Sequence, residues 1–210
     1  IVNIEVTPMD CGRMSAMTAK RVVAQGIREA ERDVLYNDRQ DQSLGLVNGT
    51  IMLVESDRVH VRVEQYKDTE AFLPKREQPE GEVYKQGETM RFYVSDIRSG
   101  YKNTQLILSR THPGLIKKLF EMEVPEIAEG IVEIKGIARE GGSRTKIAVH
   151  SNDPDVDAQG SCIGGRGIRV MAINNELKNE KIDIIKWSED PKEFITASLS
   201  PAKVLTCEVD

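Results

Sequence analysis

The spacing of hydrophobic residues changes along the chain, and each spacing predicts a different kind of element. Between residues 18 and 40 the apolar positions recur every three to four residues, with most charged residues between them, a pattern typical of an amphipathic helix. The stripe consists of Val22, Val23, Ile27, Ala30, Val34 and Leu35. We predict a solvated helix packed on a neighbouring element; the alternative is a connector that docks a partner protein.

Residues 44 to 109 contain five short runs of β-branched and apolar residues separated by turn signals. The runs are GTIMLVES from residue 49, RVHVRVEQ from residue 58, TEAFLP from residue 69, ETMRFYVSDI from residue 88 and TQLILS from residue 104. Five short strands in so little chain favour a small closed all-β barrel. In the second run, one buried and one basic face are predicted by the alternation of Val59, Val61 and Val63 with Arg58, His60 and Arg62. Such a basic face suits a nucleic-acid backbone, and it is equally typical of solvated strand residues.

From Pro113 onward, helical and strand spacings alternate. A helix is predicted from Pro113 to near Pro125, with its inner side formed by Leu115, Ile116, Leu119, Phe120 and Met122. Two strands over 130–139 and 145–151 follow, joined by a glycine-containing turn. The remaining elements are a short helix near 157–163, a glycine-rich loop, a helix over 168–177 with Val170, Ile173 and Leu177 inward, and a strand over 181–187. The order is α-β-β-α-α-β, that of an α+β module.

The composition limits the class of protein. The chain has 210 residues, 39% of them hydrophobic, which suffices for one large domain or two small ones. No apolar run approaches the ~20 residues of a membrane span and no signal peptide is visible, so we expect a cytoplasmic protein. Cys11, Cys162 and Cys207 fit neither a disulfide framework nor a zinc site, and we expect free thiols. The net charge of −5 does not exclude a nucleic-acid partner, because binding depends on where the cations lie.

The stretch GSCIGGRGIRV, residues 160–170, is the strongest candidate for a binding site. Glycines at three of the four positions 164–167 leave the backbone open to a ligand, and the loop leads into the N-terminus of a helix, which favours an anion such as phosphate. Arg166 projects from the loop, and Arg169 lies in the first helical turn, where the helix dipole disfavours a cation. An anionic partner would explain both arginines; the alternative is two solvated arginines without a ligand.

The surroundings of this loop exclude two common nucleotide motifs. A dinucleotide fingerprint needs its glycines between a strand and a helix, and a P-loop needs Lys-Ser/Thr after them, neither of which is present. What remains is the GXXG loop of a type II KH module, which clamps about four nucleotides beside an apolar groove. For the groove we name Ile163, Ile147 and Val149, which could instead be plain core. The candidate RNA-binding residues are Gly164, Gly165, Arg166, Gly167, Arg169, Ile163, Lys146, Arg58, His60 and Arg62.

We find no pattern of residues that predicts catalysis. The three histidines His60, His112 and His150 are widely spaced, and the HExxH, CxxC and GxSxG motifs are absent. A run of Asp153, Asp155 and Asp157 lacks the glycine and glutamate of a calcium loop and favours loop and helix-capping roles. We therefore predict a protein that is not an enzyme and has no cofactor or metal.

Several stretches resemble the NusA family of bacterial transcription elongation, termination and antitermination factors. They are TAKRVVAQGIREAER (18–32), EVPEI (123–127), GSRTKIAV (142–149), GSCIGGRGIRV (160–170), NELKNEKIDIIKW (175–187) and LSPAKV (199–204). The resemblance covers nearly the whole chain. It implies the end of an N-terminal polymerase-binding domain with a connector helix (1–42), an S1 barrel (43–110), a type II KH domain (111–198) and the start of a second KH domain (199–210). The missing initiator Met and the strand-like ending KVLTCEVD likewise predict a piece of a longer chain.

The resemblance also implies a function. Members of the family bind nascent single-stranded RNA and RNA polymerase and modulate pausing, termination and antitermination, so we expect these partners, other antitermination factors and a monomer. Residue by residue, the family's RNA-contacting loop corresponds to Gly164, Gly165, Arg166 and Gly167. Two departures stand out: Ala158-Gln159 replaces a common Pro-Val, and Gly165 replaces a bulkier residue, so we expect altered affinity.

The barrel lacks the exposed aromatic residues of strongly binding S1 domains. Val59, His60 and Phe72 occupy the corresponding region, and Phe72 could be core. We therefore expect the barrel to supply electrostatics and positioning more than base stacking.

Two alternatives to this function remain open. One is an S1-KH subunit of an RNA-degrading complex, although the phosphorylase of that class has its KH module first. The other is a protein-docking module that uses the helix at 18–40 and the acidic surface.

Overall fold

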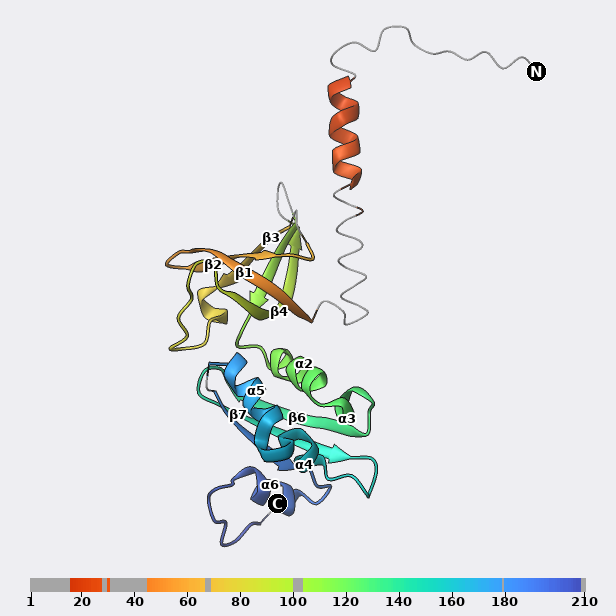
Figure 1. The fold of residues 1–210 in the computed structure, drawn as a ribbon, viewed down its shortest axis with the longest axis vertical. Coiled ribbons are helices and arrows are strands. Elements are labelled where there is room, and N and C mark those ends of the chain that lie inside the picture. The colour runs from red at the N-terminus through yellow and green to blue at the C-terminus, as the bar shows by residue number, and fades with distance from the viewer. Residues whose placement is uncertain are drawn as a thin grey trace, which may run out of the picture.

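The computed structural model describes residues 16–27, 30, 45–66, 69–99, 104–178 and 180–208. Residues 16–27 and residue 30 are helical, as predicted, and the rest of the predicted helix lies outside the described residues (Figure 1). The described part of the apolar stripe is exposed and not packed on a neighbour as predicted: Val22, Val23 and Ile27 are 62%, 61% and 55% exposed. Val34 and Leu35 lie outside the described residues. No helix among the described residues is both long and apolar enough to cross a membrane.

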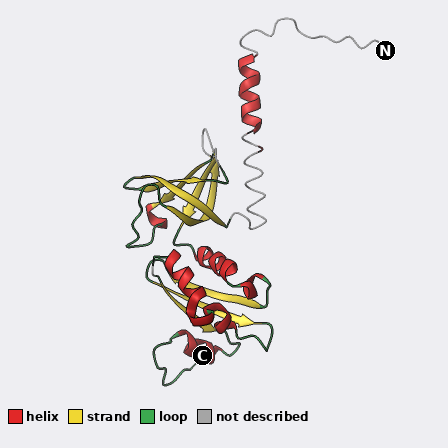
Figure 2. Cartoon of the chain, in the orientation of Figure 1, coloured by secondary structure: helices red, strands yellow, loops and turns green. Residues whose placement is uncertain are grey.

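The first globular unit is the predicted barrel of five strands. They are β1 (Leu46–Val54), β2 (Arg58–Val63), β3 (Glu70–Pro74), β4 (Thr89–Ser99) and β5 (Thr104–Ser109), with a 3-10 turn η1 (Lys75–Glu77) after β3. The barrel closes in the order β1-β2-β3-β5-β4, and only β3 and β5 pair in parallel. Figure 2 shows the strands of the barrel in yellow. Alternate residues point inward, so the barrel encloses an aliphatic core with one phenylalanine, Phe92. The prediction of a closed barrel is confirmed.

The second unit is an α+β module with the predicted order of elements. It consists of α2 (Pro113–Glu123), α3 (Pro125–Ala128), β6 (Val132–Glu140), β7 (Arg144–Ser151), α4 (Ala158–Ile163), the 3-10 turn η2 (Gly165–Gly167), α5 (Ile168–Glu176), β8 (Lys181–Lys186) and α6 (Pro191–Ser198). The sheet has the order β6-β7-β8, antiparallel between β6 and β7 and parallel between β7 and β8. Helices α2, α4 and α5 cover one face of it (Figure 1) and enclose a second core.

Several details differ from the sequence-based expectations. Met122 is 52% exposed, because Val124 takes the buried position where α2 ends and α3 begins. The two short helices α3 and α6 were not predicted, although Asp190 caps α6 and Pro191 opens it, which is a recognisable helix start. The ending that we expected to begin a strand is not a strand over residues 203–208, because no described strand pairs with it.

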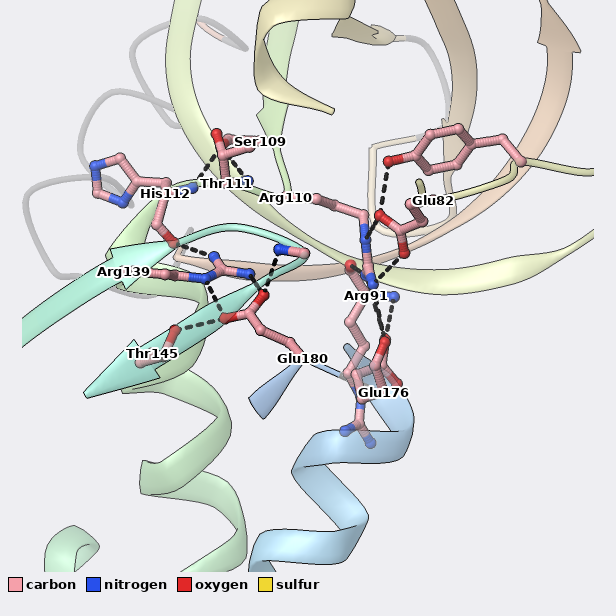
Figure 3. A network of polar contacts seen from close by, with 12 residues as sticks. Glu82, Arg91, Ser109, Arg110, Thr111, His112, Arg139, Thr145, Glu176 and Glu180 are labelled. Atoms are coloured by element: carbon pink, nitrogen blue, oxygen red, sulfur yellow. Dashed lines mark hydrogen bonds and ion pairs between the residues drawn. The ribbon is translucent and has the colours of Figure 1, made fainter. Parts of the chain in front are cut away.

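A buried arginine joins the barrel to the α+β module. Arg110 follows β5 and is 1% exposed; its guanidinium donates from Nε to Oε2 of Glu82 at 2.8 Å and from Nη2 to the carbonyl of Glu176 at 2.8 Å. Nη1 donates to the carbonyl of Arg91 at 2.6 Å, and the guanidinium carbon lies 6.0 Å from the centre of the Phe92 ring. Figure 3 shows these hydrogen bonds. We call the four residues Glu82, Arg91, Arg110 and Glu176 the junction cluster.

A second polar cluster lies beside the first and fixes the turn between β6 and β7 (Figure 3). Arg139 donates two 2.9 Å hydrogen bonds to the carboxylate of Glu180, which also accepts from the backbone N–H of Gly142 at 2.9 Å and from the hydroxyl of Thr145 at 2.5 Å. Burial alone would raise the pKa of Glu180, but these hydrogen bonds and the charge of Arg139 lower it. Glu180 therefore stays ionised inside the protein.

His112 caps α2 at the boundary between the two units. Its Nδ1 accepts from the backbone N–H of Gly114 at 2.9 Å, and its ring stacks on Tyr93 of β4 with 4.5 Å between ring centres. Burial lowers the pKa of His112 below its usual 6.5, and the charge of Arg139 acts in the same direction, against Glu77. The neutral imidazole is therefore the form that the fold uses, because only it can accept the hydrogen bond of the cap.

Replacing Arg110 by Met should strongly destabilise the protein. The substitution leaves the carboxylate of Glu82 buried without its cation, which typically costs about 3–5 kcal/mol of unfolding free energy. Urea unfolding, followed by circular dichroism and by the fluorescence of the single tryptophan, Trp187, measures the loss. Adding Glu82→Gln to the Met variant should recover part of it; an Arg110→Met protein as stable as the wild type would contradict the role of the junction cluster.

The cap of α2 should make stability depend on pH. Because the pKa of His112 is lowered on folding, its contribution is fully present above the unfolded value of 6.5 and is lost as the pH falls below 6.5 through the folded value. Unfolding free energies measured between pH 5.5 and 7.5 should fall less with acid in His112→Asn, which caps without titrating. Identical pH dependences of variant and wild type would show that the cap is not sensitive to protonation.

Candidate nucleic-acid interface

The loop between α4 and α5 has a backbone that only glycine adopts easily. Gly164 has φ 74° and ψ 168°, and Gly167 has φ 78° and ψ 13°. The N–H of Gly164 donates to the carbonyl of Gly160 at 2.9 Å and that of Gly167 to the carbonyl of Gly164 at 3.0 Å, so the turn is compact. The predicted GXXG turn between two helices is therefore present.

The two middle residues of the loop are open to solvent. A Cβ on Gly165 would meet nothing within 4 Å, and the exposed Arg166 has the left-handed values φ 56° and ψ 23°. Arg166 makes no ion pair with any described residue. An available guanidinium next to open backbone and the N-terminus of α5 forms a concentrated positive site.

Arg169 is not available in the same way. Its Nη1 donates to Oε2 of Glu126 at 2.9 Å and to the carbonyl of Ser161 at 2.6 Å, and its alkyl chain lies over Gly164. A hydrogen bond from its own backbone N–H, followed by the bond and charge of Arg169, holds the pKa of Glu126 below its usual range against desolvation. Glu126 thus neutralises Arg169, the cation that the helix dipole disfavours. The expected anionic partner of Arg169 is therefore a side chain of the protein itself. In the structure Arg169 ties the loop to α3.

Lys146 is also engaged within the chain. Its ammonium group donates to the carbonyls of Ser198 and Ser200, the latter at 2.9 Å. The segment after α6 therefore covers a residue that we had expected to face RNA. The signal was invisible in the sequence because the partners lie more than fifty positions away and are backbone atoms.

The groove candidates separate into core and surface. Ile147 and Val149 are fully buried in the core of the α+β module, so they cannot line a groove. Ile163, directly before the loop, is 40% exposed and remains the apolar surface next to it. Cys162 beside it is buried, which raises the pKa of its thiol to about 11 and keeps it protonated and inert.

The basic face of β2 forms as predicted, but acidic neighbours neutralise much of it. Val59, Val61 and Val63 point inward. Arg58 pairs with Asp57 at 2.8 Å, and Nε2 of His60 lies 3.3 Å from Oε2 of Glu55, while Arg62 is exposed and makes no ion pair with any described residue.

On the neighbouring strand β3, Phe72 is not core. It lies half-buried under the guanidinium of Arg58, because Ala71 and Leu73 take the inward positions. The surface formed by β2 and β3 is thus mixed, and of its basic residues Arg58, His60 and Arg62 the first two lie beside carboxylates.

The aspartate run serves the backbone, as predicted. Asp157 caps α4 by accepting from the N–H of Gln159 at 3.1 Å, and Asp153 accepts from the N–H of Asp155 at 3.0 Å. No group of metal-binding side chains forms among the residues that the structure describes. Cys162 and Cys207 are free thiols, and Cys11 lies outside the described residues.

The two leading glycines of the loop should respond differently to alanine. Gly164→Ala places a Cβ 2.8 Å from Cγ of Arg169 at a φ of +74°, so we expect a loss of about 1–3 kcal/mol of unfolding free energy. Gly165→Ala meets no neighbour and should leave stability unchanged or slightly raised. Urea unfolding of the pair tests this, and equal stabilities would contradict the loop geometry.

Comparison with known proteins agrees with this architecture. A model of the NusA-like first KH domain matches residues 110–187. The transcription termination/antitermination protein NusA of Bacillus subtilis is 49% identical over 205 residues, 98% of this chain and 54% of that protein. The NusA proteins of Halalkalibacterium halodurans and Thermus thermophilus are 46% and 43% identical over 100% and 98% of this chain, which covers 54% and 52% of them.

The chain spans about half the length of the curated relatives it matches. The similarity extends from the N-terminal helix through the barrel to the end of the α+β module, so it includes every part that the structure describes. With a closed five-stranded barrel followed by a KH module that carries a GXXG loop, the chain belongs to the NusA family.

Proposed function

We propose that this chain binds single-stranded RNA through Gly164, Gly165, Arg166 and Gly167 and serves in transcription termination and antitermination. The observation that carries the proposal is the open GXXG loop, with Arg166 exposed at the N-terminus of α5. Its relatives are transcription termination/antitermination proteins, which supports the process.

The loop would act on the sugar-phosphate backbone. At Gly165 no side chain stands between a phosphate and the backbone N–H groups, and Arg166 can add a charge-assisted hydrogen bond. Bases would then lie toward Ile163 on the adjoining surface of α4. No covalent bond changes; RNA held near RNA polymerase would shift the balance between pausing, hairpin formation and continued elongation.

We include in the proposal the remaining partners of the family: RNA polymerase and other antitermination factors, met by a cytoplasmic monomer. Support for a protein partner comes from the helix at 16–27, whose residues Met17, Val22, Val23 and Ile27 are more than half exposed. The barrel precedes the KH module in this chain, and the sequence is 49% identical to a NusA protein. Both observations favour this role over that of a subunit in an RNA-degrading complex.

A charge-reversed loop should lose RNA binding. Changing Gly165 and Arg166 together to Asp places carboxylates against the phosphates, and the affinity for a fluorescent single-stranded RNA should fall by about tenfold or more. Fluorescence anisotropy at 50 and 200 mM salt measures it; affinity of the wild type should fall with salt, and the variant should show a shallower dependence.

The single variant Arg166→Asp should also weaken RNA binding. Its matched control is Arg76→Asp, because both substitutions make the same change of charge. The side chain of Arg76 is 69% exposed and lies on the barrel, away from the loop. It should retain most of the wild-type affinity. Equal loss in both variants would indicate a diffuse electrostatic effect, and unchanged binding by the loop variants, or no binding by the wild type, would overturn the proposal.

A further inference from the structure

Strand β8 lies at the end of the KH sheet: it pairs with β7 on one side, and no described strand pairs with its other edge. The backbone N–H of Lys181 donates to Ser143 and that of Trp187 to Val149, so the odd-numbered residues of this parallel strand face β7. The even-numbered residues, Ile184 among them, therefore direct their N–H and C=O groups to the open edge. Unstacked RNA bases are recognised through hydrogen bonds on their edges, and free N–H and C=O groups of a strand can supply the partners.

Gln159 reaches this edge from α4. Its Nε2 donates to the carbonyl of Ile184 at 2.9 Å. Because a carbonyl can only accept, the nitrogen of the amide must face the strand, and the oxygen Oε1 is turned away from it. Oε1 makes no hydrogen bond with any described residue, and it is not buried. It is therefore accessible to solvent.

Gln159 and Ile163 lie on the same side of α4, which leads directly into the GXXG loop. Ile163 follows Gln159 by four residues and thus lies on the same side of α4, about 6 Å further along the helix axis. Gly164 comes directly after it. A strand of RNA clamped at the loop and running along α4 would therefore place one base on Ile163 and bring its edge to Oε1 of Gln159.

We propose that Gln159 selects the base that lies against α4 by requiring an amino group at C6 of a purine or at C4 of a pyrimidine. The inference rests on the proposed RNA binding. Oε1 is an acceptor, which an amino group on the ring can satisfy: adenine carries one at C6 and cytosine one at C4. Guanine at C6 and uracil at C4 carry a carbonyl oxygen instead, which would leave two acceptors facing each other, and the amino group of guanine is at C2, on the other side of its edge. Adenine and cytosine are therefore preferred.

The experiment compares two pyrimidine octamers, oligo(rC) and oligo(rU), which have the same ring size and differ in the group at C4. Anisotropy with the 210-residue chain should give about five- to tenfold tighter binding of oligo(rC), the effect of one hydrogen bond of about 1 kcal/mol. In Gln159→Met, which has similar length and lacks a strong acceptor, the ratio of the two affinities should fall to within about twofold of unity.

A second variant distinguishes base recognition by Gln159 from a purely structural role of this residue. Gln159→Lys can still donate to the carbonyl of Ile184 but has no acceptor. If Gln159 only tied α4 to β8, Lys would keep the wild-type ratio and Met would weaken both octamers equally. We expect Lys to strengthen binding of both octamers through its charge and to abolish the preference, as Met does.

The possible failures are distinguishable. Oligo(rC) and oligo(rU) bound equally by the wild type, tighter binding of oligo(rU), or a preference that survives in both variants would overturn the role of Gln159, while Arg166→Asp still weakened both octamers. Absence of binding to either octamer, or binding unaffected by Arg166→Asp, would overturn the proposed function and this inference together.

Discussion

The rest of the structure depends on the burial of Arg110 between the barrel and the KH module. A guanidinium that is 1% exposed is costly to desolvate, and it is tolerated because Glu82 supplies an opposite charge while the carbonyls of Arg91 and Glu176 take further N–H donors. These acceptors come from both units (Figure 3), so separating the units would break the hydrogen bond from Arg110 to the carbonyl of Glu176. Bending at the junction therefore costs hydrogen bonds of a buried charged group.

A single helix connects the junction cluster to the GXXG loop. Helix α5 begins at Ile168, directly after the GXXG turn, and ends at Glu176, which binds Arg110. Its nine residues span about 13 Å, so the loop and the barrel are fixed at the two ends of one rigid rod. Under the proposed function, an RNA in contact with both the loop and the barrel would meet preorganised sites, and the second contact would gain from the high effective concentration that the first creates.

The sequence predicted the elements well because their signals are local. Alternation in β2 and the glycines of the loop identify a strand and a turn without knowledge of the fold. The roles of the charged residues could not be predicted in this way, since they depend on partners that only the fold brings close: Arg169 finds Glu126 at a distance of 43 positions, and Arg110 finds Glu176 at 66. No neighbour of Arg110 in the sequence distinguishes it from a solvated arginine, so its burial could not be predicted from the sequence.

These pairings change the electrostatics of the proposed interface. Of the cations that the sequence offered, Arg169, Lys146 and Arg58 are already bound to oxygen atoms of the chain, while Arg166 and Arg62 make no ion pair with any described residue. A net charge of −5 and few unpaired cations among these candidate contacts predict weak, salt-sensitive attraction to RNA. Under the proposed function, affinity would therefore come mainly from short-range contacts at the open backbone of the loop, and selectivity from fixed acceptors such as the amide of Gln159, because long-range charge cannot distinguish one base from another.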